Sequence, residues 1–172
     1  MKYVLLIVVA LAISLPNDAA GQNISFGATG GLLSGGEKFK SGSESVTASD
    51  TGFYLGLTSK IPLSGKFTIA PEADYGRIEN SSFLFVAGRV HYFVLPKFYL
   101  QLGPQVTYLF DDLNDAFSQA GLDISSGVGY EINDHFGINA RYSFEITNRS
   151  KLEFDDVSSR LRWLMIGIEY VF

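Results

Sequence analysis

The sequence predicts an all-β fold, an eight-stranded antiparallel up-and-down transmembrane β-barrel preceded by a cleaved signal peptide. Three observations predict it: an N-terminal leader, eight later segments in which apolar and polar residues alternate, and connections that alternate between short and mostly long ones. Alternation with a period of two indicates strands with two different faces. Eight such strands with this arrangement of connections are typical of a barrel that crosses a membrane.

The composition is that of one domain with a large apolar fraction. The chain has 172 residues, of which 47% are hydrophobic and 18% charged, and it contains no cysteine. Disulfides, thiol nucleophiles and cysteine-ligated metals are therefore excluded. The net charge of −5 argues against nucleic acid as a partner, because a nucleic-acid binder needs a basic face to displace counterions from phosphates.

The first segment has the pattern of a secretory signal peptide. Lys2 supplies a positive start, Tyr3 to Leu15 is apolar, and small residues at Ala19 and Gly21 suit cleavage after Gly21. A membrane anchor is the weaker interpretation, because this apolar run is shorter than the roughly 20 residues that a helical span needs. We therefore expect a signal peptide at 1–21 and an exported barrel domain at 22–172.

Alternation is clearest between His135 and Thr147. Phe136, Ile138 and Ala140 fall on one face of this segment, and Gly137, Asn139 and Arg141 on the other. Seven more segments alternate in the same way, the first four more weakly. The strands are expected at about 23–33, 52–61, 66–77, 82–93, 98–110, 122–131, 135–147 and 163–172.

The connections indicate which end of the barrel faces outward. The even-numbered ones are tight turns, around Pro62 to Gly65, Val94 to Pro96 and Ile132 to Asp134. Among the odd-numbered ones, Ser34 to Asp50, Asp111 to Gln119 and Asn148 to Arg160 are long, and only Glu79 to Ser81 is short. Outer-membrane barrels have short periplasmic turns and longer extracellular loops. The tight turns and both ends of the mature chain are therefore expected on the periplasmic side.

The apolar faces carry aromatic residues near both ends of the strands. Near the tight turns these are Tyr92, Phe98, Tyr130, Phe136, Tyr170 and Phe172, and near the long loops Phe53, Tyr75, Tyr108, Phe110 and Phe144. Two aromatic belts around an aliphatic band match the two interfaces of a membrane. A soluble lipocalin-like barrel would have its apolar face inside. The sequence thus predicts an apolar exterior and a polar lumen.

Several segments resemble a known family. Gly127 to Glu131, the Asn-Asp turn and Phe136 to Asn148 resemble the small outer-membrane β-barrel domain family often labelled "porin family protein", and more distantly the OmpA/OmpX-type barrels. Pro71 to Gly76 and Ile168 to Phe172 fit the same family, and the resemblance extends over 22–172. It implies the fold and a location in the bacterial outer membrane, and it says little about activity.

The resemblance also implies a role for the last strand. In such proteins the barrel assembly machinery recognises a final strand that ends on an aromatic residue. Here Tyr170 and Phe172 occupy those positions, after Leu164, Ile166 and Ile168 on the same face. We therefore expect this machinery as a partner through Tyr170 and Phe172.

The polar faces place ionisable and amide side chains in the lumen. The candidates are Tyr54, Lys60, Glu72, Asp74, Arg89, His91, Gln101, Gln105, Asp123, Glu131, Arg141, Glu145 and Glu169. Counting from the tight turns puts Glu72, Arg89, Gln101 and Arg141 in one middle layer. An eight-stranded barrel is only wide enough for its own side chains. Because unpaired buried charges are costly, we expect a plug in which both arginines are shared among Glu72, Asp74, Glu145 and Glu169. A proton or ion pathway is the competing interpretation.

An enzyme is not expected. The chain has two histidines, His91 and His135, and both lie next to tight turns. In the small outer-membrane barrels that are enzymes, the catalytic groups lie at or near the outer-leaflet end, where neither histidine can reach a nucleophile. No catalytic, cofactor-binding or metal-ligating residue is therefore predicted, and no cofactor.

The outer connections are the other candidate for function. Asp111 to Asp115 and Glu153 to Asp156 are acidic, and they fit either a solvated surface or a weak divalent-cation site without the EF-hand pattern. Basic residues expected near the same surface, which could touch lipopolysaccharide phosphates, are Lys38, Lys40, Arg149, Lys151, Arg160 and Arg162. Ser34 to Asp50 has the composition of a flexible binding loop.

The sequence thus predicts an integral outer-membrane barrel, monomeric, with a side-chain-filled lumen and a structural or surface-interaction role such as adhesion or loop-mediated binding. The expected partners are outer-membrane lipids including lipopolysaccharide and an extracellular ligand that the sequence does not identify. A narrow pore or small-solute channel is the alternative, and an outer-membrane enzyme comes third.

Overall fold

A computed structural model gives the fold of the chain and describes residues 24–41, 44–111, 118–149 and 157–172. The signal peptide expected at 1–21 lies outside these residues. Within the described ranges, no helix is long and apolar enough to cross a membrane.

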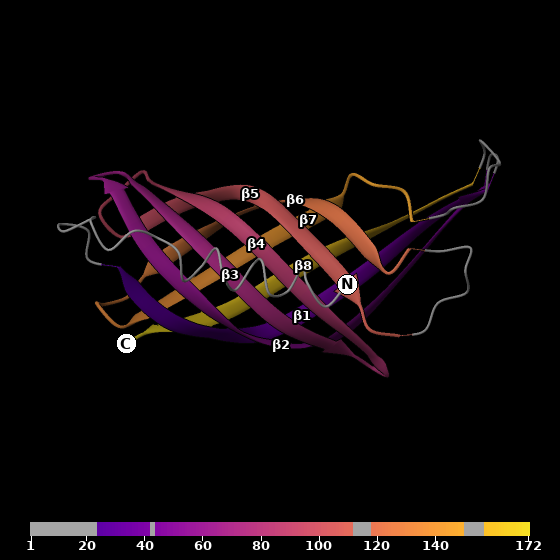
Figure 1. Cartoon of the computed structure of the whole chain (residues 1–172), viewed down its shortest axis with the longest axis horizontal. Helices are drawn as coiled ribbons and strands as arrows, with labels where there is room; N and C mark the ends of the chain where they lie inside the picture. Colours follow the sequence, from indigo (N-terminus) through magenta and orange to yellow (C-terminus); the bar gives the residue numbers. More distant parts are fainter. Residues whose placement is uncertain (1–23, 42–43, 112–117, 150–156) are drawn as a thin grey trace, which may run out of the picture.

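The described residues form eight strands that close into one antiparallel barrel, in which every strand pairs with its neighbours in sequence and β1 pairs with β8 (Figure 1). The strands are β1 (Ser25–Ser41), β2 (Glu44–Ser64), β3 (Phe67–Ile78), β4 (Ser81–Phe93), β5 (Phe98–Leu109), β6 (Ala120–Glu131), β7 (Phe136–Glu145) and β8 (Val157–Val171). Closure leaves no free sheet edge, as a barrel in lipid requires. The predicted fold is confirmed.

Side chains alternate between a buried lumenal face and an exposed outer face along each strand. In β3, every second residue from Thr68 to Ile78 is buried, while Tyr75 and its outer-face neighbours are exposed or half-buried. Both predicted aromatic belts lie on the outer face, where Phe53 is 47% exposed and Phe136 is 46% exposed. The exterior is therefore apolar from one belt to the other, as the pattern predicts.

The even-numbered connections are tight, and they lie at the end where the C-terminus lies, on the left in Figure 1. The first is shorter than predicted, because β2 continues to Ser64 through an irregularity in its pairing between Pro62 and Ser64. At the opposite end, the turn between β3 and β4 places Glu79 at a φ of 50°.

One connection predicted to be long is largely strand and another ends earlier than predicted, so both predicted boundaries were wrong. The segment from Ser34 to Asp50 continues the β1–β2 hairpin, whose pairing extends to Ser41 and Glu44. β8 begins at Val157, inside the link predicted up to Arg160, and also pairs with the extended β1. These strands project beyond the barrel at the end opposite the tight turns (Figure 1). Backbone pairing needs no apolar alternation, so a ribbon in water has no hydrophobic pattern to reveal it.

Candidate functional site: the filled lumen

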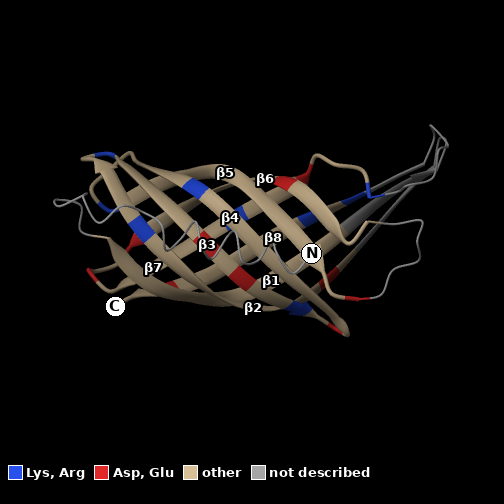
Figure 2. Cartoon of the chain, in the orientation of Figure 1, with Lys and Arg blue, Asp and Glu red and all other residues tan. Residues whose placement is uncertain are grey.

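Charged residues occur along the barrel wall as well as at its ends (Figure 2). On the strands most of them face inward. The lumenal cations among the described residues are Lys60, Arg89, Arg141 and Arg149, and the carboxylates are Glu72, Asp74, Asp123, Glu131, Glu145 and Glu169. Every lumenal candidate predicted from the sequence faces the interior. Carboxylates outnumber cations there, as the sequence indicates.

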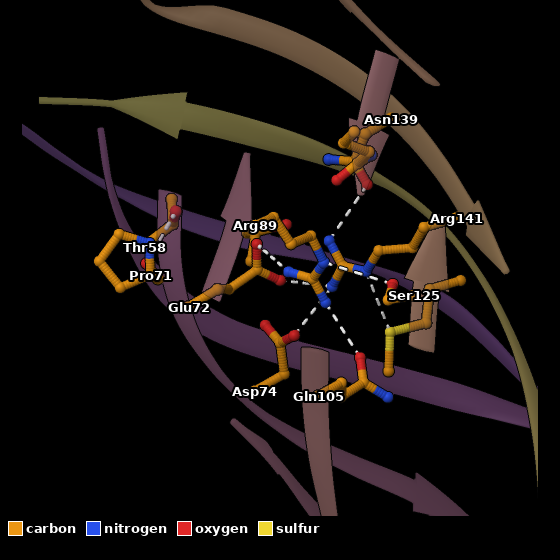
Figure 3. A network of polar contacts seen from close by, with 12 residues as sticks. Thr58, Pro71, Glu72, Asp74, Arg89, Gln105, Ser125, Asn139 and Arg141 are labelled. Atoms are coloured by element: carbon orange, nitrogen blue, oxygen red, sulfur yellow. Dashed lines mark hydrogen bonds and ion pairs between the residues drawn. The ribbon is translucent and has the colours of Figure 1, made fainter. Parts of the chain in front are cut away.

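Two arginines and two carboxylates form the centre of the lumen (Figure 3). Arg141 on β7 reaches across to β3, where its Nη2 lies 2.5 Å from Glu72 Oε1 and 2.8 Å from Asp74 Oδ2. Arg89 on β4 contacts the other oxygen of Glu72 at 3.0 Å. All four residues are buried. The pairing is balanced in charge, which is what burial in a narrow lumen requires.

A second set of polar side chains extends this network along β5 and β6. Arg89 Nη2 donates to Gln105 Oε1 at 3.0 Å, and Gln105 Nε2 donates to Asp123 Oδ2 at 3.1 Å. Thr107 donates to the same carboxylate oxygen of Asp123. Arg89 Nε also lies 3.4 Å from Ser125 Oγ. The central network therefore continues along this wall toward the outer end.

The predicted plug exists, but three of its predicted members are elsewhere. Glu145 pairs with Arg149, and Glu169 pairs with Lys60, so neither contacts Arg89 or Arg141. Gln101 donates to the Val128 carbonyl instead of joining the central layer, where Gln105 takes its place. Counting residues from the turns ignores the tilt and stagger of barrel strands, which shift the level of each residue along the axis.

Near the tight turns, one lysine lies between two carboxylates. Lys60 Nζ lies 3.0 Å from Glu131 Oε1 and 2.6 Å from Glu169 Oε1. Above this group, His91 stacks on Tyr99 with ring centroids 4.3 Å apart. Lys60 and Glu131 also line a small polar pocket of about 120 Å³ at this mouth of the barrel. The lumen therefore opens into a polar pocket at its tight-turn end.

The outer end of the lumen is partly apolar, which the prediction of a polar lumen missed. A buried cluster there comprises Leu33, Tyr54, Ile78, Phe83, Phe85, Trp163 and Met165. The Trp163 ring packs edge-on against the rings of Phe83 and Phe85, with ring centroids 4.8 Å and 5.1 Å apart. The Tyr54 ring faces the guanidinium of Arg141 at 4.9 Å and so joins the cluster to the central network. The alternating pattern already places Trp163 and Met165 inside, so the signal was present.

Arg149 was expected at the outer surface, near lipid phosphates, and that expectation was wrong. It is only 3% exposed. Its Nε donates to Glu145 at 2.8 Å, and its other nitrogens donate to the carbonyls of Gln119 and Thr107. Its own carbonyl accepts the Ser118 amide. Arg149 therefore connects the segment that follows β7 with the end of β5 and with the residue that precedes β6.

Both histidines lie in the described part of the chain, His91 buried in the lumen and His135 exposed. No group of three or more His, Asp and Glu residues there is placed to hold a metal ion. His91 is buried against Tyr99, and the exposed His135 contacts the Val171 carbonyl at 3.0 Å. Most of the acidic segments 111–115 and 153–156 lie outside the described residues. What this arrangement does is fill the barrel and hold its walls together.

Comparison with solved structures finds the same fold. The crystal structure of Neisserial surface protein A (NspA) matches with a TM-score of 0.52 at 16% identity, covering 87% of this chain and 99% of that one. The crystal structure of the outer membrane protein OprG from Pseudomonas aeruginosa matches with a TM-score of 0.50 at 17% identity, covering 88% and 97%. No protein-family model matches the sequence, and the comparison with curated proteins found no match.

These likenesses are in fold, and they agree with the features that the chain shows by itself. The barrel is closed, its exterior is apolar between two aromatic belts, and most charged residues of its described strands lie inside. Those are the properties of a barrel that is surrounded by lipid. The chain therefore has the eight-stranded barrel fold of these outer-membrane proteins.

Proposed function

We propose that this protein is exported by its signal peptide to the bacterial outer membrane, where its barrel is a closed scaffold with a structural or surface-interaction role. The observation that supports a closed scaffold most directly is the filled lumen. Arg141 bridges β7 to β3 through Glu72 and Asp74, and the Trp163 cluster occupies the outer end above it. Because opposite walls are joined by ion pairs, a continuous open path for solutes is not expected.

Electrical recording tests the closed scaffold. The purified protein, inserted into planar bilayers, is expected to give no stable unitary current, while an established open porin inserted into the same lipid gives one. Insertion is checked separately by heat-modifiable electrophoretic mobility of the bilayer-extracted protein. Stable unitary currents from the inserted protein would contradict the proposal.

A narrow pore for small solutes is the alternative, and one observation favours it. The wall formed by β5, β6 and β7 is polar up to the outer end, through Gln105, Thr107 and Asp123. Asp123 Oδ1 is buried there, and Asp74 Oδ1 is buried on β3, both without a hydrogen-bond partner among the described residues. Buried oxygens of this kind are usually satisfied by water. If this wall conducts, the conductance should change in Asp123→Asn, which keeps the shape of the side chain and removes its charge.

The surface role is expected to reside in the part of the chain that projects from the barrel. Residues 38–41 and 44–47 belong to the extended hairpin and lie beyond the apolar cluster of the lumen. Replacing the sequence from 38 to 47 with a short Asn-Gly turn should leave a heat-modifiable barrel and abolish binding to cells or matrix. If the barrel no longer folds, the division into scaffold and binding hairpin is wrong.

We further propose that the protein is not an enzyme. The buried lumenal carboxylates Glu72, Asp74 and Glu145 are engaged by arginines. His91 is stacked on Tyr99 at the periplasmic end. Incubation with labelled lipid A or peptide is expected to give no product. Product from the wild type that disappears in His91→Ala would overturn this proposal.

The partners that we propose are lipopolysaccharide and the barrel assembly machinery, with the protein acting as a monomer. Arg160 and Arg162 are exposed toward the outer end of β8, above the lipid-facing Leu164. A guanidinium in this position suits a phosphate of the outer leaflet. Tyr170 and Phe172 are exposed at the opposite end of β8. Lipopolysaccharide retained during purification should decrease in Arg160→Gln/Arg162→Gln and remain unchanged in Arg77→Gln, and an equal decrease in both would contradict the site.

A further inference from the structure

The lipid-facing wall of the barrel has a groove that the closed scaffold does not require. It measures about 570 Å³ and runs over β4, β5 and β6. Its outer-face lining residues are Val90, Tyr92, Leu100, Leu102, Pro104 and Ile124, with Gln101 and Gly103 at its floor. Its exposed lining is almost entirely apolar.

The groove lies where the β4–β5 ladder is interrupted. Ala87 pairs with Gln105, and the next pair in the ladder is Val90 with Leu102. The two positions between these pairs on each strand have no ladder partner. Pro104 lacks the N–H that a ladder bond needs. Gly103 has no Cβ, and a Cβ there would collide with the Gly88 carbonyl. The strands approach closely at this point without pairing.

Small outer-face residues make the surface concave here. A Cβ built on Gly88 meets no heavy atom within 4 Å. Leu102 is 58% exposed and Val90 is 42% exposed, and these two ladder partners stand on the tight-turn side of Gly88. Gly88 lies across from Pro104 and next to Val90, so a larger side chain there would stand at the edge of the groove without striking the barrel.

The position of the groove points to one leaflet. It extends from Pro104, in the middle of β5, to Leu100 and Tyr92 near the tight turn of 94–97. Four residues of strand span about 13 Å, which is comparable to half of the apolar band of about 25 Å on such barrels. The groove therefore faces the hydrocarbon of the periplasmic leaflet.

Two lysines lie in the tight turns next to the ends of β4 and β5, beyond Tyr92 and Leu100 of the groove. Lys97 is in the turn between β4 and β5, and its Nζ donates to the Ile132 carbonyl at 2.9 Å, which holds the ammonium near the β5–β6 boundary. Lys66 lies beside the end of β4, where its carbonyl accepts the Phe93 amide at 2.9 Å. Both lysines are exposed. An ammonium has three N–H donors, so a phosphate can be bound there without breaking the Lys97 bond.

We propose that this groove binds one glycerophospholipid of the periplasmic leaflet, with an acyl chain along Leu100 to Pro104 and the phosphate at Lys97 and Lys66. The apolar groove and the cations follow each other in the order in which a phospholipid presents its chain and its phosphate. Bound lipid would cover the unpaired section of the β4–β5 ladder. This site is separate from the outer surface and from the proposed closed scaffold, and it holds whether or not the barrel conducts.

Native mass spectrometry with a defined lipid tests the acyl-chain part. The full mature protein in detergent micelles is titrated with palmitoyl-oleoyl phosphatidylglycerol, and the wild type is expected to retain one molecule. Gly88→Leu should weaken this binding about tenfold, the effect of losing contact with about two methylenes. Ala73→Leu, which adds a side chain of the same size to the outer face of β3, should bind as the wild type does.

The phosphate part is tested by Lys66→Gln and Lys97→Gln, each expected to weaken binding about fivefold, with Arg77→Gln at the outer end as the unchanged control. These variants keep the test decisive if Gly88→Leu does not fold, as judged by heat-modifiable mobility. Wild-type binding by folded Gly88→Leu or by the double lysine variant overturns the assignment. An equal loss in Ala73→Leu or Arg77→Gln also overturns it, because the lipid would then be bound by the barrel surface in general.

Discussion

Arg141 on β7 and Asp74 on β3 are 67 residues apart in the chain, yet their side chains meet in the centre of the lumen, with Nη2 and Oδ2 separated by 2.8 Å. β3 and β7 lie on opposite sides of the closed sheet. A contact between them crosses the whole lumen. This ion pair, shared with Glu72, occupies the centre of the lumen.

Removing Arg141 should destabilise the barrel strongly. Arg141→Ala leaves Glu72 and Asp74 as buried carboxylates with one fewer cation, and breaking a buried pair in this way typically costs about 3–5 kcal/mol. Urea unfolding of the protein in lipid vesicles measures the change. The double variant Arg141→Met/Asp74→Asn removes one charge of each sign and leaves Arg89 paired with Glu72, so it should recover part of the loss. If it is no more stable than Arg141→Ala, uncompensated charge is not the cause.

Gly129 should be intolerant of even one methyl group. A Cβ at this position collides with the Tyr99 ring, which is held by its stack on His91. Gly129→Ala should therefore cost about 1–3 kcal/mol through overpacking. Gly137→Ala is the matched control, because its nearest contact is an ordinary 3.5 Å. The second-site change Tyr99→Leu should rescue Gly129→Ala, and equal unfolding midpoints for both alanine variants would contradict this close approach.

Trp163 is the single tryptophan of the chain, so its fluorescence tests whether its position on β8 faces the lumen. It is 2% exposed and packs against Phe83 and Phe85. In vesicles of brominated phospholipid, its fluorescence should resist quenching. Moving the indole to the lipid face, in Trp163→Phe/Leu164→Trp, should make the emission strongly quenched. Strong quenching of the wild type would place Trp163 outside and reverse the faces of β8.

Arg149 should stabilise the outer mouth more than the barrel as a whole. Arg149→Gln removes the ion pair with Glu145, which itself accepts the Leu161 amide at 2.9 Å. The amides of Ser118 and Leu161 should exchange with deuterium faster, because both depend on this group. Amides in the middle of β3 serve as the internal control. Equal acceleration at both places would indicate global destabilisation instead.

A substitution at Phe172 should distinguish a role in assisted assembly from a role in folding. Its ring is 72% exposed, and its backbone amide donates to the Phe26 carbonyl at 2.9 Å. Phe172→Ala keeps that backbone bond and removes the terminal aromatic group. Refolding into detergent micelles should proceed as in the wild type, while assembly by purified barrel assembly machinery should slow several-fold. Equal slowing in both assays would mean that Phe172 acts through stability.

Local alternation determined most of the architecture. Because side chains of a strand point to opposite faces in turn, residues as far apart in the chain as Glu72 and Arg141 could be assigned to the lumen from their neighbours alone. The same rule assigned the lipid-facing belts and the tight turns at one end. Charge balance then predicted that arginines and carboxylates would pair, and the central group confirms this.

Tertiary structure decided at which level each lumenal side chain lies and what it meets. The two-residue alternation indicates which face of the sheet a side chain is on. The tilt and stagger of the strands in the closed barrel set the position of that side chain along the barrel axis. For that reason Gln105 and not Gln101 joins Arg89, and Glu145 meets Arg149. The β1–β2 ribbon was hidden because its pairing is between backbones. The groove at Pro104 depends on two strands meeting, so it too exists only in the closed barrel.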